Sequence, residues 1–266
     1  FELIIVDDAS TDDTKETVAA FSDPRINYIR HEANLHASAS RNTGIRHAQG
    51  KYLAFLDDDD EWHPSKLLVQ LKLIEASSPK VGLVYCWLNF IDPDGNVVSK
   101  RHPTIRGDVF LDVLDMQRLG NISTVLIRQH IAEEIGGFDE TLLRGNDGDF
   151  IRRVCQTYHV DLVPEVLVTM HIGHAYQRIT RSDETGIKNA ILSEEVKLRK
   201  FAKILNEHPK RSATIYTSIA LHYARLESWR LFLEYQFKAL VKAPFYPRIY
   251  LRLLLGIRYL MYSSKR

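Results

Sequence analysis

The chain has 266 residues, of which 45% are hydrophobic and 26% charged, as in an ordinary globular protein with one large domain and room for an appendage. No uninterrupted apolar run reaches the roughly 20 residues that cross a bilayer, and the two isolated cysteines, Cys86 and Cys155, exclude a disulfide framework and favour a reducing, cytoplasmic setting. The net charge of +1 hides an asymmetry: residues 185–266 hold 16 Lys and Arg against 5 Asp and Glu, a net of +11, which leaves 19 against 29, a net of −10, in residues 1–184.

The first hundred residues predict alternating strands and helices. Residues 2–6 (ELIIV) are short, apolar and β-branched, which predicts a buried strand that ends at Asp7-Asp8. Further strands are expected at residues 25–30, 51–56 and 81–91, and helices at residues 10–21, 38–48 and 64–76. This alternation predicts an α/β fold with a mainly parallel sheet flanked by helices. In such sheets ligands bind at the carboxyl ends of the strands.

The rest of the chain changes character twice. Residues 101–184 are less regular and are expected to extend the same domain. Residues 185–266 predict a basic, α-helical C-terminal region, with helices at 187–206, 212–225, 228–241 and 248–263.

Four consecutive aspartates, residues 57–60, follow the predicted strand 51–56. Each close pair of like charges near a protein surface costs on the order of 1 to a few kcal/mol, so either some of them protonate or a cation neutralises them. Carboxylate oxygens suit Mg²⁺ or Mn²⁺. The alternative is a solvated acidic turn, but the position opposite Asp7-Asp8 favours a metal site. His171 or His174, at another strand end, could complete its shell, with a structural role as the alternative.

Five segments resemble the sequence blocks of family 2 glycosyltransferases, in the same order and at the expected spacing. They are FELIIVDDASTD (1–12), SRNTG (40–44), YLAFLDDDDEWHP (52–64), GGFDE (136–140) and GNDGD (145–149). Each block alone is only moderately specific, but five in order are a strong signal, and the resemblance covers roughly residues 1–180. It implies a GT-A, Rossmann-like fold over residues 1–184, with residues 1–100 as the nucleotide-sugar half and residues 101–184 as the acceptor half.

The resemblance also implies roles for individual residues. Asp8 resembles the aspartate that binds the nucleotide base, Arg41 the basic residue beside the nucleotide, Asp57 and Asp59 the D-x-D pair that holds a metal, and Asp147 the general base. Asp7 and Asp58 are expected beside them in the nucleotide-sugar site. Asp149 is expected either to orient an acceptor hydroxyl or to cap a helix.

These roles describe one displacement at a sugar carbon. Loss of the diphosphate builds negative charge that Mg²⁺ or Mn²⁺ stabilises. One carboxylate, opposite the leaving group, removes the proton of the attacking hydroxyl. The single in-line displacement that follows inverts the anomeric carbon. The expected donor is a nucleoside-diphosphate sugar, with UDP-sugars favoured, and the expected acceptor is a glycan or a lipid-linked glycan in cell-envelope polysaccharide synthesis.

Three departures from the family pattern qualify the resemblance. The usual first strand (V-x-V-I-I-P-x-Y-N) is missing, so a truncated chain is expected; Asn146 replaces the usual glutamate; and no Q-x-x-R-W motif is found, which favours transfer of a single sugar. The first two departures leave open an inactive binding or scaffold module. A nucleotidyltransferase is a weaker alternative, because no Gly-rich, basic phosphate loop follows the first strand.

The last segment, residues 248–266, places arginines among leucines and isoleucines, a pattern typical of a helix in a membrane interface. A helix packed on the protein is the alternative. Peripheral contact with the inner face of a membrane is therefore an open expectation, whereas nucleic-acid binding is not expected because no recognition motif accompanies the basic residues.

Overall fold

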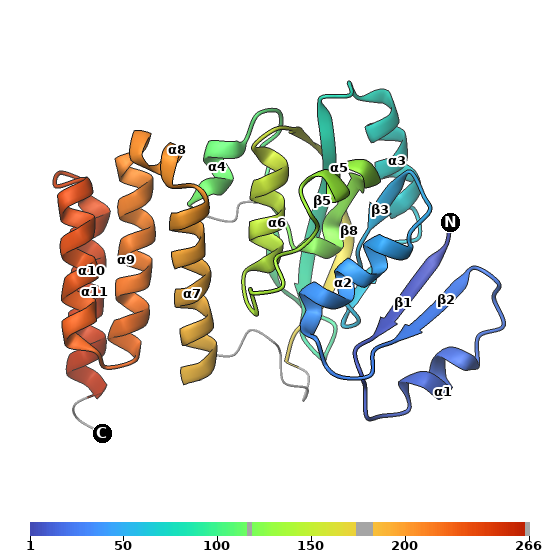
Figure 1. Cartoon of the computed structure of the whole chain (residues 1–266), viewed down its shortest axis with the longest axis horizontal. Helices are drawn as coiled ribbons and strands as arrows, with labels where there is room; N and C mark the ends of the chain where they lie inside the picture. Colours follow the sequence, from blue (N-terminus) through green and yellow to red (C-terminus); the bar gives the residue numbers. More distant parts are fainter. Residues whose placement is uncertain (116–118, 174–182, 264–266) are drawn as a thin grey trace. The chain divides into compact units, whose positions relative to one another are not determined.

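The computed structural model describes residues 1–115, 119–173 and 183–263. The chain divides into two compact units, Phe1–Tyr176 and Gln177–Arg266. The first combines strands and helices, and the second is helical wherever it is described as regular structure (Figure 1).

The N-terminal segment forms a separate pair of parallel strands. β1 (Leu3–Asp7) pairs with β2 (Ile26–Arg30), and α1 (Thr14–Ala19) connects them. The expected buried strand at residues 2–6 is only half-buried, since Leu3 is 43% exposed and Asp7 is the one buried residue of β1. The reason is that β1 pairs with one strand, β2, among the described strands, so no described strand lies along its other edge. α2 (His36–His47) follows and packs beside β1.

The larger sheet has the strand order β3-β7-β5-β8-β4, with β6 paired to β5. Its strands are β3 (Tyr52–Ala54), β4 (Asp60–Trp62), β5 (Val81–Ile91), β6 (Val97–Arg101), β7 (Val125–Arg128) and β8 (His159–His171). The α/β class is confirmed, but within this sheet only β5 and β8 run parallel, and the other pairs are antiparallel. An apolar run such as β5 shows burial on both faces and carries no information on strand direction, which is why the sheet was expected to be mainly parallel.

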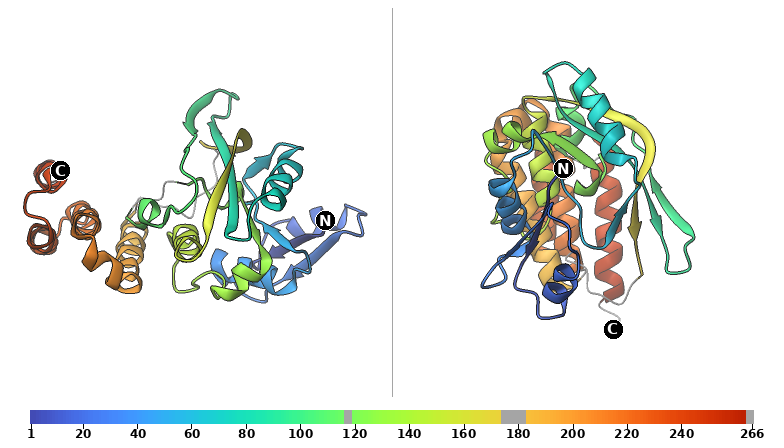
Figure 2. Two further views of the ribbon diagram at one scale, coloured as in Figure 1. Left: turned by 90° about the horizontal axis from the view of Figure 1, so that it is seen from above. Right: turned by 90° about the vertical axis from the view of Figure 1, so that its right-hand side faces the viewer.

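Helices cover both faces of this sheet (Figure 2). On one face α3 (Lys66–Ala76) buries Ile74 against Val84 of β5. On the other face Leu83 and Tyr85 of β5 join a core with Phe150 of α6 (Asn146–Cys155). Alternate residues of one strand thus enter two cores. Three short helical segments complete the unit, namely α4 (Phe110–Leu114), the 3₁₀ turn η1 (Ile122–Thr124) and α5 (Gln129–Glu134).

The second unit consists of helices. They are α7 (Glu184–Lys200), α8 (Ala202–Glu207), α9 (Pro209–Arg225), α10 (Trp229–Lys242) and α11 (Pro247–Ser263). The expected helix 187–206 is two helices, because the chain leaves helical geometry at Phe201, which is buried. Among the helices in the described ranges, none has both the length and the apolar character that crossing a membrane requires.

Candidate active site

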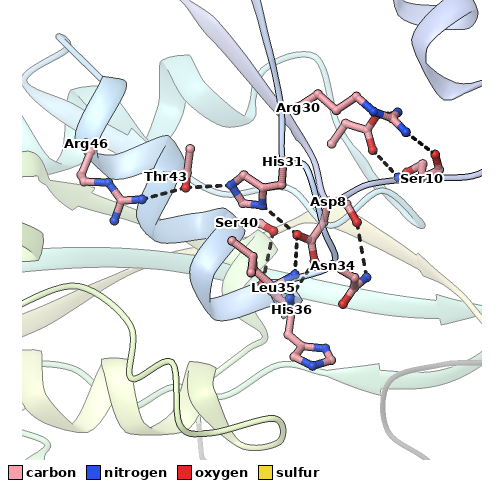
Figure 3. A network of polar contacts seen from close by, with 11 residues as sticks. Asp8, Ser10, Arg30, His31, Asn34, Leu35, His36, Ser40, Thr43 and Arg46 are labelled. Carbon is pink, nitrogen blue, oxygen red and sulfur yellow. Dashed lines mark hydrogen bonds and ion pairs between the residues drawn. The ribbon is translucent and has the colours of Figure 1, made fainter.

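Asp8 directly follows β1, and its carboxylate accepts hydrogen bonds from the backbone at the start of α2 (Figure 3). His31 Nδ1 lies 2.7 Å from Asp8 Oδ1, and the backbone amides of Leu35 and His36 donate to the carboxylate over 2.9 and 2.7 Å. Burial opposes ionisation of Asp8, but these hydrogen bonds outweigh it and lower its pKa. Three acceptor positions are thereby used, two on Oδ1 and one on Oδ2. A carboxylate has about four such positions, so Oδ2 keeps one for a ligand.

His31 connects Asp8 with α2, a link that the sequence blocks did not indicate. Its Nε2 lies 3.0 Å from Thr43 Oγ1, and Arg46 donates a hydrogen bond to the same oxygen over 2.8 Å (Figure 3). Because the carboxylate of Asp8 only accepts, the Nδ1 nitrogen of His31 is assigned the proton. Thr43 belongs to the SRNTG block, and the block was the one signal that pointed to this position.

Asp7 does not face the same way. Its carboxylate is buried and accepts hydrogen bonds from the Ser10 amide (2.7 Å), the Tyr28 hydroxyl and the Arg30 guanidinium. Burial alone would raise its pKa, but these donors lower it to about 2. The structure therefore places the buried Asp7 carboxylate among its partners in and beside the β1–β2 pair, and it does not bring Asp7 together with the carboxylate of Asp8; a role in the nucleotide-sugar site stays a prediction.

Arg41 brings together two of the expected site residues from distant parts of the sequence. From α2 it donates to Asp57, which follows β3, over 2.6 Å and to Asp147, at the start of α6, over 2.8 Å. The three side chains are 15%, 29% and 27% exposed, so they line a partly open surface. Arg41 also lies over the ring of Phe138, 5.3 Å from its centroid, which holds the guanidinium in place.

This cluster of two carboxylates and one guanidinium carries a net negative charge, and its members shift one another's ionisation. Burial raises the pKa of Asp147; Arg41 opposes the rise, and repulsion from Asp57 adds to it. Burial works against the charge of Arg41, but its two carboxylate partners raise its pKa, so it remains protonated. Asp147 is thus a carboxylate that takes up a proton more readily than an ordinary aspartate.

The acidic run forms a tight turn above a buried support. The Asp60 amide donates to the Asp57 carbonyl over 3.0 Å, and the Asp57 amide donates to Ser123 Oγ over 3.1 Å. Asp58 is exposed and Asp59 half-buried, whereas Asp60 is 7% exposed and accepts from Asn121 over 2.7 Å. Burial is the main reason that the pKa of Asp60 rises to about 6. Asp60 is therefore a support of the turn rather than one of its outward-facing carboxylates.

The described part of the chain contains no group of three or more His, Cys, Asp or Glu side chains arranged for a metal ion. Asp57 and Asp59 nevertheless fit Mg²⁺ or Mn²⁺, because Mg²⁺ is usually held by one or two carboxylates together with water and phosphate oxygens. One observation supports this fit: Asp60 Oδ1 and Asn121 Oδ1, beside the turn, are buried oxygens with no hydrogen-bond partner among the described residues. His171 lies 3.1 Å from Glu61 instead, and His174 is outside the described residues.

The start of α6 holds the expected base. Gly145 adopts a left-handed conformation (φ 74°) and places Asn146 at the first helical position. The Asn146 side chain donates to Ser38 Oγ over 3.0 Å and accepts from the Asp147 amide over 2.8 Å, which ties α6 to α2. Asn146 therefore has a structural use here in place of the usual glutamate.

Asp149, the expected acceptor contact, lies on the buried side of α6. It is 3% exposed and forms an ion pair of 2.8 Å with Arg153, which in turn donates to the carbonyls of Ile135 and Gly137. Asp149 thus supports the GGFDE segment and does not reach the surface that Arg41 lines.

Asn42, next to Arg41, also anchors that segment, although no role was expected for it from the sequence. It accepts from the Phe138 amide over 2.7 Å and donates to the Phe138 carbonyl and to Glu140 over 2.9 and 2.8 Å. Phe138 in turn stacks on Phe150 with ring centroids 4.2 Å apart. The helix that carries Arg41 and the helix that carries Asp147 are thereby locked to one another.

Known glycosyltransferases resemble this chain in sequence and in fold. The amylovoran biosynthesis glycosyltransferase AmsB of Erwinia amylovora is 33% identical over 176 residues, which cover 58% of this chain and 54% of that protein. The crystal structure of S. aureus TarS 1–349 in complex with UDP-GlcNAc matches with a TM-score of 0.62 at 14% identity, over 91% of this chain and 80% of that one. The mannosyltransferase PcManGT from Pyrobaculum calidifontis, in complex with GDP-Man and Mn²⁺, matches with a TM-score of 0.54 at 16% identity, over 99% and 74%.

At these identities the solved structures show the fold, which is the GT-A fold of glycosyltransferases. The chain spans 62%, 19% and 54% of the lengths of three curated relatives that it matches. Residues 1–132 match the family model described as glycosyl transferase family 2, and they include β1, Arg41 and the acidic turn. These residues, the first half of the chain, therefore form a glycosyltransferase family 2 domain.

Proposed function

We propose that this chain transfers a single sugar from a nucleoside-diphosphate sugar, with a UDP-sugar as the expected donor, to a hydroxyl of a glycan or lipid-linked acceptor, with inversion. The observation that carries the proposal is Arg41, which lies between Asp57 of the acidic turn and Asp147 of α6. It brings a carboxylate suited to the leaving group and a carboxylate suited to the acceptor to one surface. The name of the relative AmsB supports a polysaccharide product.

In this proposal the acidic turn receives the diphosphate. Asp57 and Asp59 would hold Mg²⁺ or Mn²⁺, and the cation supplies stabilisation of the negative charge that develops on the diphosphate. The Mn²⁺ in the PcManGT complex supports a divalent cation. Asp8 would accept a hydrogen bond from the nucleotide base at its remaining Oδ2 position, and Asp58, which is exposed, would border the donor site.

Asp147 is the proposed general base. Its raised pKa suits a group that must accept a proton from an acceptor hydroxyl. While Arg41 holds its carboxylate, however, Asp147 is a weaker base. The diphosphate of an incoming donor competes for the same guanidinium, since arginine binds phosphate and carboxylate in similar geometry. Donor binding would therefore release Asp147 for the acceptor, which favours binding of the donor before the acceptor.

We assign residues 1–184 to the catalytic domain and residues 185–266 to a basic helical extension. A lipid-linked acceptor would place the enzyme at the inner face of a membrane, reached through the extension. The described helices of that extension carry the apolar and basic residues that such a contact requires.

The proposal is tested by incubating the full chain with a panel of UDP-, GDP- and dTDP-sugars and measuring release of the nucleoside diphosphate, with Mn²⁺ and with a chelator. At least one donor should be turned over with Mn²⁺, and Asp59→Ala should lose that turnover. Asp12→Ala should keep it, because Asp12 is an exposed aspartate whose carboxylate bonds to Thr14 alone among the described residues. Absence of binding and turnover with every donor would instead support an inactive scaffold.

A further inference from the structure

The helical unit carries an apolar surface formed by exposed side chains of α10 and α11. On α10, exposed residues spaced four apart form one row, and α11 exposes leucines three or four residues apart. We call this surface the outer face, and it consists of Trp229, Leu233, Phe237, Val241, Leu251 and Leu254. Phe237 and Leu254 are 66% and 65% exposed, and Phe245, in the turn between the helices, is 95% exposed. Monomeric proteins rarely leave so many large apolar side chains together in water.

The outer face lies on one side because both helices pack on α9 with their opposite sides. Phe232 of α10 and Leu253 and Ile257 of α11 join Ala220 and Ala224 of α9 in one cluster. α10 and α11 also touch closely: a Cβ at Gly256 would lie 2.2 Å from the Phe232 ring. Figure 2 shows both helices next to α9 within this unit. The outward rows of α10 and α11 therefore form one surface.

The net charge of the segment that carries the outer face favours one kind of partner. Residues 229–263 contain six Lys and Arg against one Asp or Glu, and the wider segment 185–266 has a net charge of +11. In a two-fold dimer the same surface meets itself, so a second copy would bring these like charges together. An anionic lipid surface attracts them, and apolar helices with basic neighbours are the elements that lie in such an interface.

We propose that the outer face docks on an anionic lipid bilayer, with α10 and α11 lying flat in its interface. The segment 248–266 expected from the sequence supplies only part of this surface. Trp229, Leu233, Phe237 and Val241 precede it, and Lys265 and Arg266 lie outside the described residues. The docking involves no step of the proposed sugar transfer, so the two proposals can fail separately.

The test is flotation of the full chain with vesicles of phosphatidylcholine containing phosphatidylglycerol, without donor or acceptor. The wild type should float with these vesicles and not with pure phosphatidylcholine. Phe237→Glu and Leu254→Glu should each weaken binding by at least about tenfold. Each removes one apolar side chain that the bilayer would bury and adds a negative charge that the anionic lipids repel. Leu192→Glu changes a 39% exposed leucine of α7, outside the outer face, and is the matched control that should bind as the wild type does.

Two further measurements separate the partners. Raising the salt from about 0.1 M to about 1 M shortens the screening length from about 10 Å to about 3 Å and should weaken vesicle binding. Brominated lipids should quench tryptophan fluorescence in the wild type and not in Trp229→Phe. The proposal is overturned if the chain does not bind anionic vesicles, or if Phe237→Glu and Leu192→Glu bind equally. A dimer in light scattering that Phe237→Glu dissociates, without vesicle binding by the wild type, would identify a second copy as the partner.

Discussion

Replacement of Arg41 by methionine tests whether the candidate site is assembled as described. The change keeps most of the side-chain length and leaves Asp57 and Asp147, both previously within 3 Å of one guanidinium, without their cation. Removing one partner of a fully buried ion pair costs about 3–5 kcal/mol. The carboxylates here are 29% and 27% exposed, so solvent screens part of the repulsion. We expect Arg41→Met to lower the free energy of unfolding by about 2–4 kcal/mol.

A double-mutant cycle gives the sharper result. In Arg41→Met/Asp147→Asn one carboxylate charge is removed together with the cation, so the double variant should be more stable than the sum of the single changes predicts, by about 1–3 kcal/mol. Urea unfolding at pH 7, with slopes compared between variants, measures each value. Arg25→Met, which removes an exposed ion pair with Asp23, is the control and should change little. Strict additivity of Arg41→Met and Asp147→Asn would refute the bridge.

Three other predictions concern stability and pH. Asp7→Asn should cost about 2 kcal/mol at pH 7, at about 1.4 kcal/mol per pKa unit, because the pKa of Asp7 is lowered from 3.8 to about 2. That stabilisation is complete above the unfolded pKa and is lost as the pH falls through the folded one, so urea unfolding should show the difference between wild type and variant fading below about pH 4. Gly137→Ala should lower the melting temperature more than Gly136→Ala: both positions have positive φ, but only at Gly137 would the new Cβ meet a neighbour, Asn42 Oδ1 at 2.4 Å. As the pH is lowered, the rate of transfer should begin to fall at a pH above the usual pKa range of aspartate, because Asp147 must be ionised and its pKa is raised. A pH–rate profile that falls only at or below pH 4 would contradict the assignment of Asp147 as the base.

Much of the fold follows from periodicity. β5 matches the expected strand 81–91 because its residues are apolar and β-branched, and α9, α10 and α11 match expected helices because their apolar residues recur at helical spacing. The direction of the strands did not follow, since an apolar run has the same pattern in parallel and antiparallel sheets. The exposure of Leu3 did not follow either, because it depends on the number of strands beside β1.

In the candidate site, too, the sequence indicated individual residues, whereas their contacts depended on the fold. The segments that resemble the family pointed to Asp8, Arg41, Asp57 and Asp147 one at a time. They did not indicate the ion pairs that join Arg41 to Asp57 and Asp147, because those pairs depend on the packing of α2 against α6. Asp7 and Asp8 are adjacent and identical in type. Successive residues of a strand face opposite sides, so only the structure shows that Asp7 turns into the strand pair and Asp8 towards α2.

The central claim is that donor binding and proton removal belong to separate carboxylates. It is tested most directly by measuring, for Asp147→Asn, both the affinity for the donor with Mn²⁺ and the rate of a single turnover with acceptor. We predict that donor affinity stays within about threefold of the wild type while the rate falls by about 10²–10⁴. A rate equal to that of the wild type, with the donor bound normally, would show that Asp147 is not the base.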